Sequence, residues 1–294
     1  MTLSKLLRGL VFSILLAVFS FSAVKLITST LSSYQEQHAF EELSAYVNTA
    51  LEPSRSITPI SASGQSDVQP STNPTGSTLH ADCITPGPTF RESVAESDFA
   101  IQAAYVSPYL ALKEQNSDFY GWLSIAGTIV DYPVMYTPND PQYYLYRAFD
   151  KSSSQSGVPF MDASCFDGCG NYLIHGHNMK NGTMFAMLLS YAQADFWQLH
   201  PSIQFDTVES PGNYEIIAAF YSKVYAPGEE GFMYYQYTDL TDSKDFDTYI
   251  EQVQQASLYE TGITAQYGDQ LLTLSTCSYH VSDGRFVVVA KKVT

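Results

Sequence analysis

The chain has 294 residues, enough for one large domain or two small ones, since a domain usually contains about 100–200 residues. Its 30 acidic and 14 basic side chains give a formal net charge of −16 at pH 7. This charge excludes nucleic acid as a partner, because phosphate binding needs a clustered Lys/Arg surface. Hydrophobic residues at 45% and aromatic residues at 14% exclude a largely disordered chain and favour strands. Four cysteines are too few for a disulfide-based scaffold.

Residues 1–28 predict a transmembrane signal anchor. Lys5 and Arg8 precede an uncharged run from Gly9 to Val24, and the flanking residues extend this run towards the ~20 residues that span a bilayer. A cleaved signal peptide also fits, although residues 20–22 (Ser-Phe-Ser) make a poor cleavage site. The basic flank keeps the N-terminus in the cytoplasm and exports the rest of the chain. We therefore expect a single-pass protein of the cell membrane with an extracellular functional domain.

Three regions come after this anchor. Residues 29–51 predict a membrane-proximal helix with a moderately apolar face. Residues 52–92 predict a linker, because 22 of the 37 residues from Pro53 to Thr89 are Ser, Thr, Pro or Gly. The globular domain is then expected over residues 93–294.

Within this domain, short β-type runs alternate with turn signals. The predicted strands lie in residues 120–135 (two strands split at Ala126-Gly127), 171–177, 214–221, 270–277 and 285–290. Helical patterns occur at 181–189 and at 242–258, and the second places Phe246, Tyr249, Ile250 and Val253 on one face. Many short strands with few helices predict a mainly β fold, a closed or nearly closed barrel.

The most informative residue for chemistry is Cys277, at the end of a predicted buried strand. If the strands on either side of residues 278–284 form a hairpin symmetric about Val281, Arg285 lies directly opposite Cys277, with Cβ atoms ~5 Å apart. A neighbouring cation stabilises a thiolate, and it supplies donors to an oxyanion formed when that thiolate attacks a carbonyl. The pair therefore predicts a cysteine nucleophile rather than an inert buried thiol.

A cysteine nucleophile needs a proton donor for its leaving group, and histidine is the usual choice. His175 and His177 flank Gly176 at a predicted strand end and face the same side of the sheet. His177 is nearer the end of the strand and is predicted to reach a cleft. The remaining histidines lie in the membrane-proximal helix, the linker, a surface turn and a hairpin tip: His38, His80, His200 and His280.

A zinc site is the competing interpretation of this region. Cys165, Cys169, His175 and His177 are all of zinc-ligand type and fall within thirteen positions. A C-x3-C spacing is unusual for a zinc knuckle, so we expect no metal and no cofactor. Cys165 and Cys169 fit either a small disulfide of an exported protein or two free thiols.

Several ordered blocks resemble the sortases, the cysteine transpeptidases of Gram-positive cell surfaces. The segment from Thr273 to Cys277, followed by Arg285, resembles their signature, and residues 176–185 are similar to the catalytic-histidine segment of class B. Residues 121–134 and 143–149 also match class B, as does a long helical insert before the cysteine strand. The resemblance covers roughly residues 100–294. The long linker is a departure from the family pattern.

The resemblance implies an eight-stranded sortase-type β-barrel with an N-terminal helix. It implies that Cys277 is the nucleophile, His177 the general acid/base and Arg285 the group that stabilises substrate and oxyanion. Ser275 would contact the substrate, and Met135 would line the groove. The implied partners are sorting-signal peptides of LPxTG or NPxTN type and an amine of a peptidoglycan precursor or a pilin subunit.

Two other classes remain open from the sequence. A papain-like cysteine peptidase also pairs cysteine with histidine, but there the cysteine comes first and begins a helix. A non-catalytic surface adhesion domain is the second alternative, and it predicts an unreactive Cys277.

Overall fold

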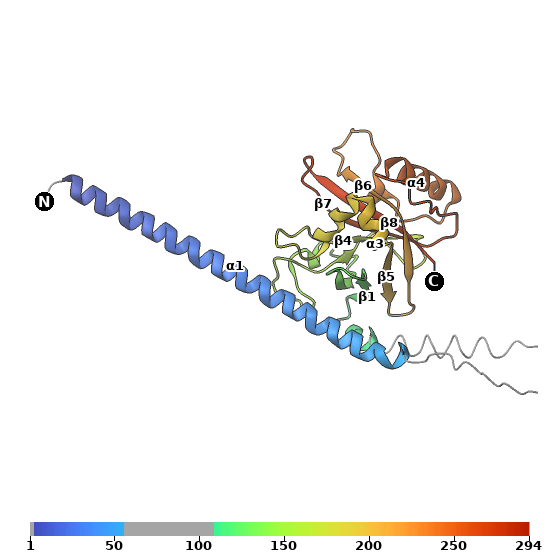
Figure 1. Ribbon diagram of the computed structural model, residues 1–294, viewed down its shortest axis with the longest axis horizontal. Coiled ribbons are helices and arrows are strands. Elements are labelled where there is room, and N and C mark those ends of the chain that lie inside the picture. Colours follow the sequence, from blue (N-terminus) through green and yellow to red (C-terminus); the bar gives the residue numbers. More distant parts are fainter. Residues whose placement is uncertain (1–2, 56–108, 294) are drawn as a thin grey trace, which may run out of the picture.

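The computed structural model describes residues 3–55 and 109–293. A long helix, α1 (Leu3–Arg55), runs past one side of a β-barrel that carries a few short helices (Figure 1). Residues 56–92 of the predicted linker, and the predicted domain start at residue 93, lie outside the described residues. The described part of the domain begins with a helical turn at residues 109–115.

Eight strands close into one barrel in the order β1-β2-β3-β4-β7-β8-β6-β5, which confirms the predicted fold class. Most neighbours are antiparallel, whereas β2–β3 and β4–β7 are parallel pairs. The strands are β1 (Phe119–Ser124), β2 (Asp131–Met135), β3 (Phe160–Met161), β4 (Asn171–His175), β5 (Ser202–Thr207), β6 (Asn213–Lys223), β7 (Leu271–Cys277) and β8 (Gly284–Lys292).

The helical segments cover the barrel and its ends. Residues 181–189 were expected to be helical, and the structure places a 3-10 helix, η2 (Phe185–Ala192), and then α3 (Ala194–Leu199) slightly later in the chain. The predicted helix at 242–258 is α4 (Ser243–Ala256), and its apolar face is buried as predicted. Two further 3-10 turns are η1 (Tyr143–Tyr146) and η3 (Tyr234–Gln236).

Strand β7 is buried on both faces, which explains its run of apolar residues. Residues 271–276 are all buried. The inner face of β7 meets the barrel core, and α4 approaches the other face, where the Tyr249 hydroxyl lies 2.8 Å from Thr273 Oγ1. A strand covered on both faces shows no polar alternation. The cysteine at its end is therefore held by the most deeply buried strand of the barrel.

Helix α1 packs directly on β2 through one of its faces. Phe40 and Val47 are buried, and the Phe40 ring meets the Tyr132 ring edge-on, with centroids 5.4 Å apart. The Ser44 hydroxyl donates a hydrogen bond to the carboxylate of Asp131 on β2. The predicted anchor (1–28) and the predicted membrane-proximal helix (29–51) thus form one continuous helix, and its second half is bound to the barrel.

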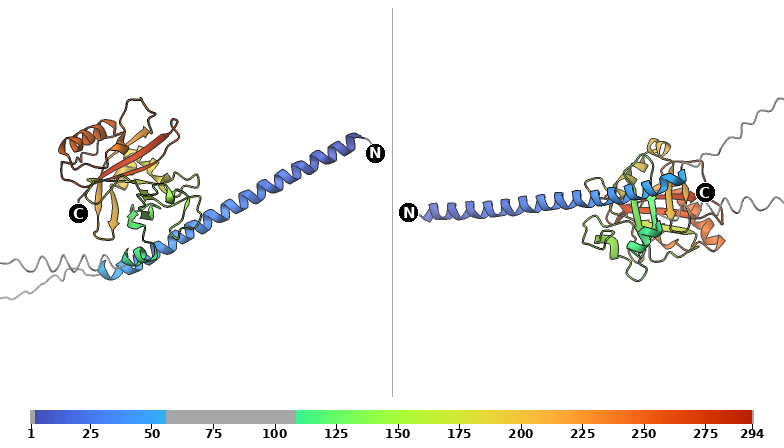
Figure 2. Two further views of the ribbon diagram at one scale, coloured as in Figure 1. Left: turned by 180° about the vertical axis from the view of Figure 1, so that it is seen from behind. Right: turned by 90° about the horizontal axis from the view of Figure 1, so that it is seen from below.

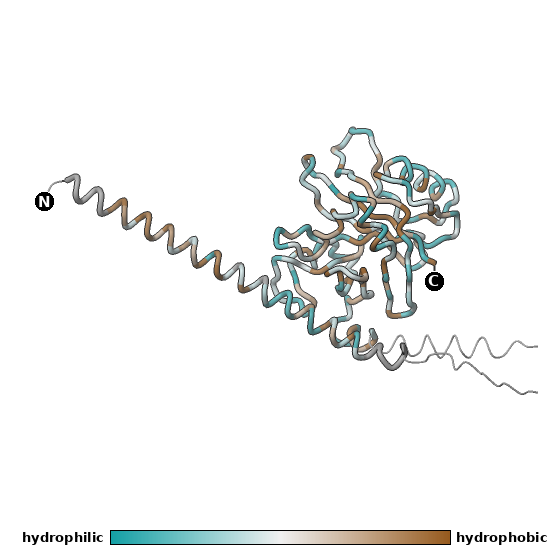
Figure 3. Tube along the Cα trace, in the orientation of Figure 1, coloured by the Kyte–Doolittle hydropathy of each residue, from teal (hydrophilic) through white to brown (hydrophobic). Residues whose placement is uncertain are grey.

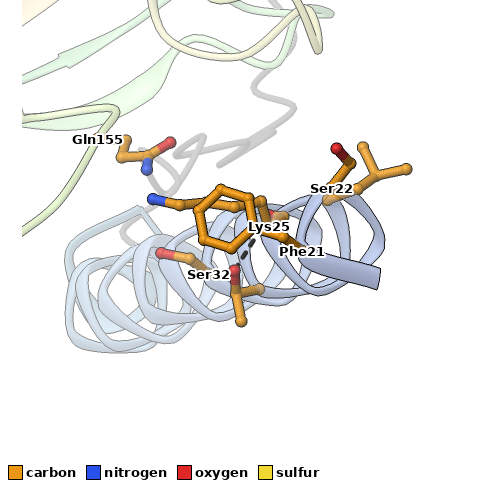
Figure 4. A pocket seen from close by; sticks show the side chains of 7 residues that line it. Phe21, Ser22, Lys25, Ser32 and Gln155 are labelled. Carbon is orange, nitrogen blue, oxygen red and sulfur yellow. Dashed lines mark hydrogen bonds between the residues drawn. The ribbon is translucent and has the colours of Figure 1, made fainter. Parts of the chain in front are cut away.

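The first half of α1 extends away from the barrel (Figure 2). It is strongly apolar along its length (Figure 3). Most of the large apolar side chains between Leu10 and Ile27 are exposed. In the described residues, α1 is the one helix long and apolar enough to cross a membrane. Its junction with the domain includes Glu36, whose carboxylate accepts hydrogen bonds from the backbone N–H groups of Gln155 and Ser156. A shallow groove of about 680 Å³ lies there, lined by Lys25 and Gln155 among others (Figure 4).

Candidate active site

Strands β7 and β8 present Cys277 and Arg285 directly opposite each other, in the register predicted from the hairpin. The turn between them is closed by a hydrogen bond from Ser278 N to Gly284 O, 2.9 Å long. A Cβ atom at Gly284 would collide with the Ser278 carbonyl oxygen, so this tight turn requires glycine. Cys277 is a free thiol and is partly exposed, as a nucleophile must be.

The Arg285 guanidinium is held by the turn. Its Nη1 atom donates hydrogen bonds to the carbonyl oxygens of Asp283 and Gly284, at 3.2 and 3.0 Å. A guanidinium has five N–H donors, and this contact uses only one nitrogen. The remaining donors on Arg285 can therefore bind an oxygen in the adjoining cleft without breaking the contact that orients the side chain.

His177 follows β4 and lines the same cleft as Cys277. Its Nε2 atom lies 2.8 Å from the carbonyl oxygen of Leu145, and its ring packs on Tyr146 with centroids 5.5 Å apart. A carbonyl oxygen can only accept, so Nε2 must carry the hydrogen of this bond. The Nδ1 atom is then the ring nitrogen that can exchange a proton.

The histidine segment and the cysteine strand are joined by hydrogen bonds beyond the end of the regular ladder. Gly176 N donates to Ser275 O at 3.1 Å, and Thr276 Oγ1 donates to Gly176 O at 2.8 Å. The Asn178 side-chain amide donates to the carbonyl oxygen of Cys277 at 2.9 Å. These three bonds hold His177 and Cys277 on adjacent, parallel paths at one end of the barrel.

Cys277, His177 and Arg285 converge on one cleft of about 490 Å³. Its walls combine apolar and aromatic side chains with a few polar groups, the usual composition of a pocket that binds an organic ligand. The lining residues are Pro141, Gln142, Leu145, Tyr146, Phe160, Asp162, Ala163, His175, Gly176, His177, Val224, Tyr234, Tyr235, Ser275, Thr276, Cys277 and Arg285.

The two predicted substrate contacts differ in position. Ser275 lines the cleft but is only 1% exposed, and its hydroxyl lies 2.7 Å from that of Tyr234. Burial raises the pKa of Tyr234 to about 12, so this hydroxyl stays protonated. Met135 is fully buried in the barrel core and is not among the residues that line the cleft. Its partner across the parallel β2–β3 pair, Phe160, lines the cleft instead.

The structure adds an ion pair that the sequence patterns missed. His175 Nε2 lies 2.9 Å from Asp162 Oδ2, and both side chains line the cleft. Burial alone raises the pKa of Asp162, but hydrogen bonds from His175 and Ser164 outweigh it and hold this pKa at about 2. Asp162 follows the two-residue strand β3, which is too short to show any periodicity in sequence.

The four residues of the alternative zinc set do not share one site. His175 binds Asp162 and His177 binds the Leu145 carbonyl, both in the cleft. Cys165 and Cys169 are buried beside the carbonyl oxygen of Asn171. Within residues 3–55 and 109–293, no group of three or more His, Cys, Asp or Glu side chains is arranged to hold a metal ion.

Comparisons with known proteins match this fold. The Sortase domain family matches residues 123–293. Sortase B of Listeria monocytogenes is 32% identical over 187 residues, which cover 62% of this chain and 73% of that protein. The solved structure of Clostridium perfringens sortase B is 27% identical, with a TM-score of 0.55, and covers 63% of this chain and 100% of its own. That of Listeria monocytogenes sortase B is 31% identical, with a TM-score of 0.54, covering 62% and 99%.

Because the matched region includes nearly the whole barrel and every strand that borders the cleft, the chain belongs to the sortase family. The similar proteins are sortases B, and the fold agrees with theirs. The protein is a class B cysteine transpeptidase, a cell-surface enzyme of cell-wall sorting. This assignment replaces the papain-like peptidase and the adhesion domain that the sequence left open.

Proposed function

We propose that Cys277 is the nucleophile of the transpeptidation, that His177 is its general acid/base, and that Arg285 stabilises the oxyanion and holds the substrate. The observation that carries this proposal is the convergence of the three side chains on one cleft from β7, β8 and the end of β4. Ser275 is proposed to shape the substrate site through its hydroxyl pair with Tyr234.

The first half-reaction is acylation. The Cys277 thiolate attacks the carbonyl carbon of the threonine in a sorting signal, and the free N–H groups of Arg285 bind the resulting oxyanion. The C–N bond then breaks, and the His177 imidazolium gives its proton to the departing amine. The products are a thioester on Cys277 and a shortened peptide with a free amino terminus.

The second half-reaction transfers the acyl group. An incoming amine attacks the thioester carbonyl and loses a proton to His177, while Cys277 leaves as a thiolate. An amide bond replaces the thioester, and the enzyme returns to its starting protonation.

We propose that the donor is an LPxTG-like or NPxTN-like signal, cut between threonine and the next residue, and that the acceptor is an amine of a peptidoglycan precursor or a pilin subunit. Sortase B of Staphylococcus aureus has been solved with a substrate, and a sortase B has been solved with triglycine. The apolar side chains of Leu145, Phe160 and Val224 in the cleft lining support an apolar residue in the bound signal.

The proposed topology is a single-pass membrane protein with its catalytic domain outside. Lys5 and Arg8 precede the apolar half of α1, which agrees with an N-terminus kept in the cytoplasm. The proposed regions are an anchor (1–28), a membrane-proximal helix (29–51), a linker (52–92) and a catalytic domain (93–294). Since α1 continues to Arg55, the helix ends slightly after the proposed boundary.

The test uses the full chain in detergent, as wild type and as Cys277→Ala. Each is incubated with LPxTG-, NPxTN- and PPxTG-like peptides, with and without an amine acceptor, and the products are read by mass spectrometry. The proposal expects an acyl-enzyme that depends on Cys277 and an amide product that depends on the amine. Acylation of the Cys277→Ala variant would refute the assigned nucleophile. Cleavage that yields only free acid at every amine concentration would refute the assigned acceptor.

A further inference from the structure

The loop between β3 and β4 holds two cysteines that have no part in the proposed transpeptidation. Cys165 and Cys169 are 2% and 0% exposed, and both are free thiols. Two turns bring them together, because Cys165 N donates to Asp162 O at 3.1 Å and Cys169 N donates to Phe166 O at 3.0 Å. Both sulfur atoms lie against the same carbonyl oxygen, that of Asn171, at 3.7 and 3.3 Å.

The shared acceptor holds both thiols at one place in the loop, and Cys165 Sγ also accepts a hydrogen bond from Leu173 N at 3.3 Å. The three residues between them form a turn at the surface, where Phe166 is exposed. Two glycines in left-handed conformations, Gly168 (φ 83°) and Gly170 (φ 85°), allow this turn to close on itself. The arrangement brings two sulfur atoms of one short loop beside one carbonyl oxygen within a cell-surface enzyme.

We propose that Cys165 and Cys169 are a disulfide-forming pair, and that their oxidation cross-links the loop between β3 and β4. In the first step, one thiolate attacks the disulfide of an oxidant, either a small-molecule disulfide or a thiol–disulfide oxidoreductase, and releases one thiol of it. The second cysteine then displaces the other thiol from the mixed disulfide. The protein loses two protons and two electrons, and the oxidant takes them up to become two thiols.

The surroundings of the two thiols in the folded loop separate their pKa values. The neighbouring Cys165 thiol, assisted by backbone N–H groups, lowers the pKa of Cys169 below the usual thiol value. The same contact, together with burial, raises the pKa of Cys165. In the folded loop, Cys169 is therefore the more acidic of the two thiols. Because both are buried, the reaction belongs to the period of folding before the loop closes, or to an opened loop.

A disulfide at this position would affect the wall of the catalytic cleft. The loop carries Asp162 and Ala163, which form part of the cleft wall, and Asp162 holds His175. The Cys165 N–H group binds the Asp162 carbonyl, so fixing Cys165 also fixes the backbone that presents the carboxylate. Oxidation is expected to stabilise the domain and to stiffen this wall, independently of Cys277.

Trypsin offers a direct test, because the loop lies between Lys151 and Lys180 with no Lys or Arg between them. Cys165 and Cys169 thus share one peptide, whereas Cys83 and Cys277 fall on two others. The full chain in detergent, unfolded and refolded with excess oxidised glutathione, is denatured, alkylated with iodoacetamide and digested. The proposal expects peptide 152–180 to carry no alkyl group, to be lighter by two hydrogens, and to accept two alkyl groups after reduction.

Alkylation of both cysteines without prior reduction would overturn the proposal. So would a glutathione adduct that persists on either cysteine, because a competent pair resolves it. A thermal melt gives a second readout: the oxidised chain should melt about 4–8 °C above the reduced one. The Cys165→Ser/Cys169→Ser chain should show no such dependence, whereas Cys277→Ala should retain it, which separates this proposal from the transpeptidation.

Discussion

The Asp162–His175 pair on the cleft wall makes a measurable contribution to the stability of the barrel. The pKa of Asp162 falls from its usual value near 3.8 to about 2, which corresponds to about 2 kcal/mol at 1.36 kcal/mol per pKa unit. Because the Asp162 side chain is 30% exposed, solvent screening reduces this figure to about 1–2 kcal/mol. Asp162→Asn should therefore lower the free energy of unfolding by about 1–2 kcal/mol at pH 7.

The pH dependence of this stabilisation follows from the lowered pKa of Asp162. A carboxyl whose pKa is depressed by folding stabilises the protein above its unfolded pKa near 4, and this contribution is lost as the pH falls towards 2. Urea unfolding of wild type and Asp162→Asn, measured from pH 7 down to pH 2, should show two curves that converge at low pH. Asp247→Asn, at an exposed position of α4, is the matched control and should run parallel to wild type. A constant separation between wild type and Asp162→Asn at every pH would refute the electrostatic account.

Three further substitutions test the site and the docking of α1. Arg285→Ala should slow acylation by a factor of ~10²–10³ with little change in melting temperature, and Arg285→Lys should restore only part of the rate, because an ammonium lacks the planar donor fork. An unchanged acylation rate would remove Arg285 from the mechanism. Tyr234→Phe should cost about 1–2 kcal/mol of stability, because it leaves the buried Ser275 hydroxyl without its partner, and adding Ser275→Ala should recover much of this loss in a double-mutant cycle. Phe40→Ala should lower the unfolding free energy of the full chain in detergent by about 2–4 kcal/mol, whereas the exposed Tyr34→Ala should change it little.

The strands that the sequence predicted are those with a clear apolar run bounded by turn signals. The β7–β8 hairpin was predictable down to its register, because a short turn and two long apolar runs allow only one symmetric pairing. Helix α4 was predictable because its buried residues repeat at helical spacing. Strand β3 has only two residues, and β5 follows directly after His200 and Pro201, which dominate the local pattern as turn signals. Strand β3 was therefore too short to show a period, whereas β5, with six residues, was hidden by the turn signals before it.

The site residues that could be predicted are those whose sequence motif also fixes their place at the end of a strand. Cys277, His177 and Arg285 all line the cleft, since each lies at the end of a strand whose direction could be inferred. Met135 lies outside the cleft lining because the next strand, β3, borders the cleft in its place through Phe160, and the sequence did not reveal the two-residue strand β3. Asp162 was missed because its partner, His175, is brought to it by the β3–β4 pairing, which a two-residue strand does not reveal.

The contact between α1 and the barrel determines how far the domain can lie from the membrane. From the sequence, residues 52–92 were predicted to be a linker between the membrane-proximal helix and the domain. In the structure α1 binds the barrel through Phe40 and Val47, and residues 109–115 lie against the same stretch of helix, where Leu43 and Leu112 line one cavity. On the proposed topology the helix leaves the bilayer near Lys25, so Phe40 lies about 22 Å further along it at 1.5 Å per residue. The distance of the barrel from the membrane is then set by a docked helix, and the length of the 56–108 segment does not enter it. On that topology, the docked part of α1 would hold the catalytic cleft at a fixed distance from the membrane.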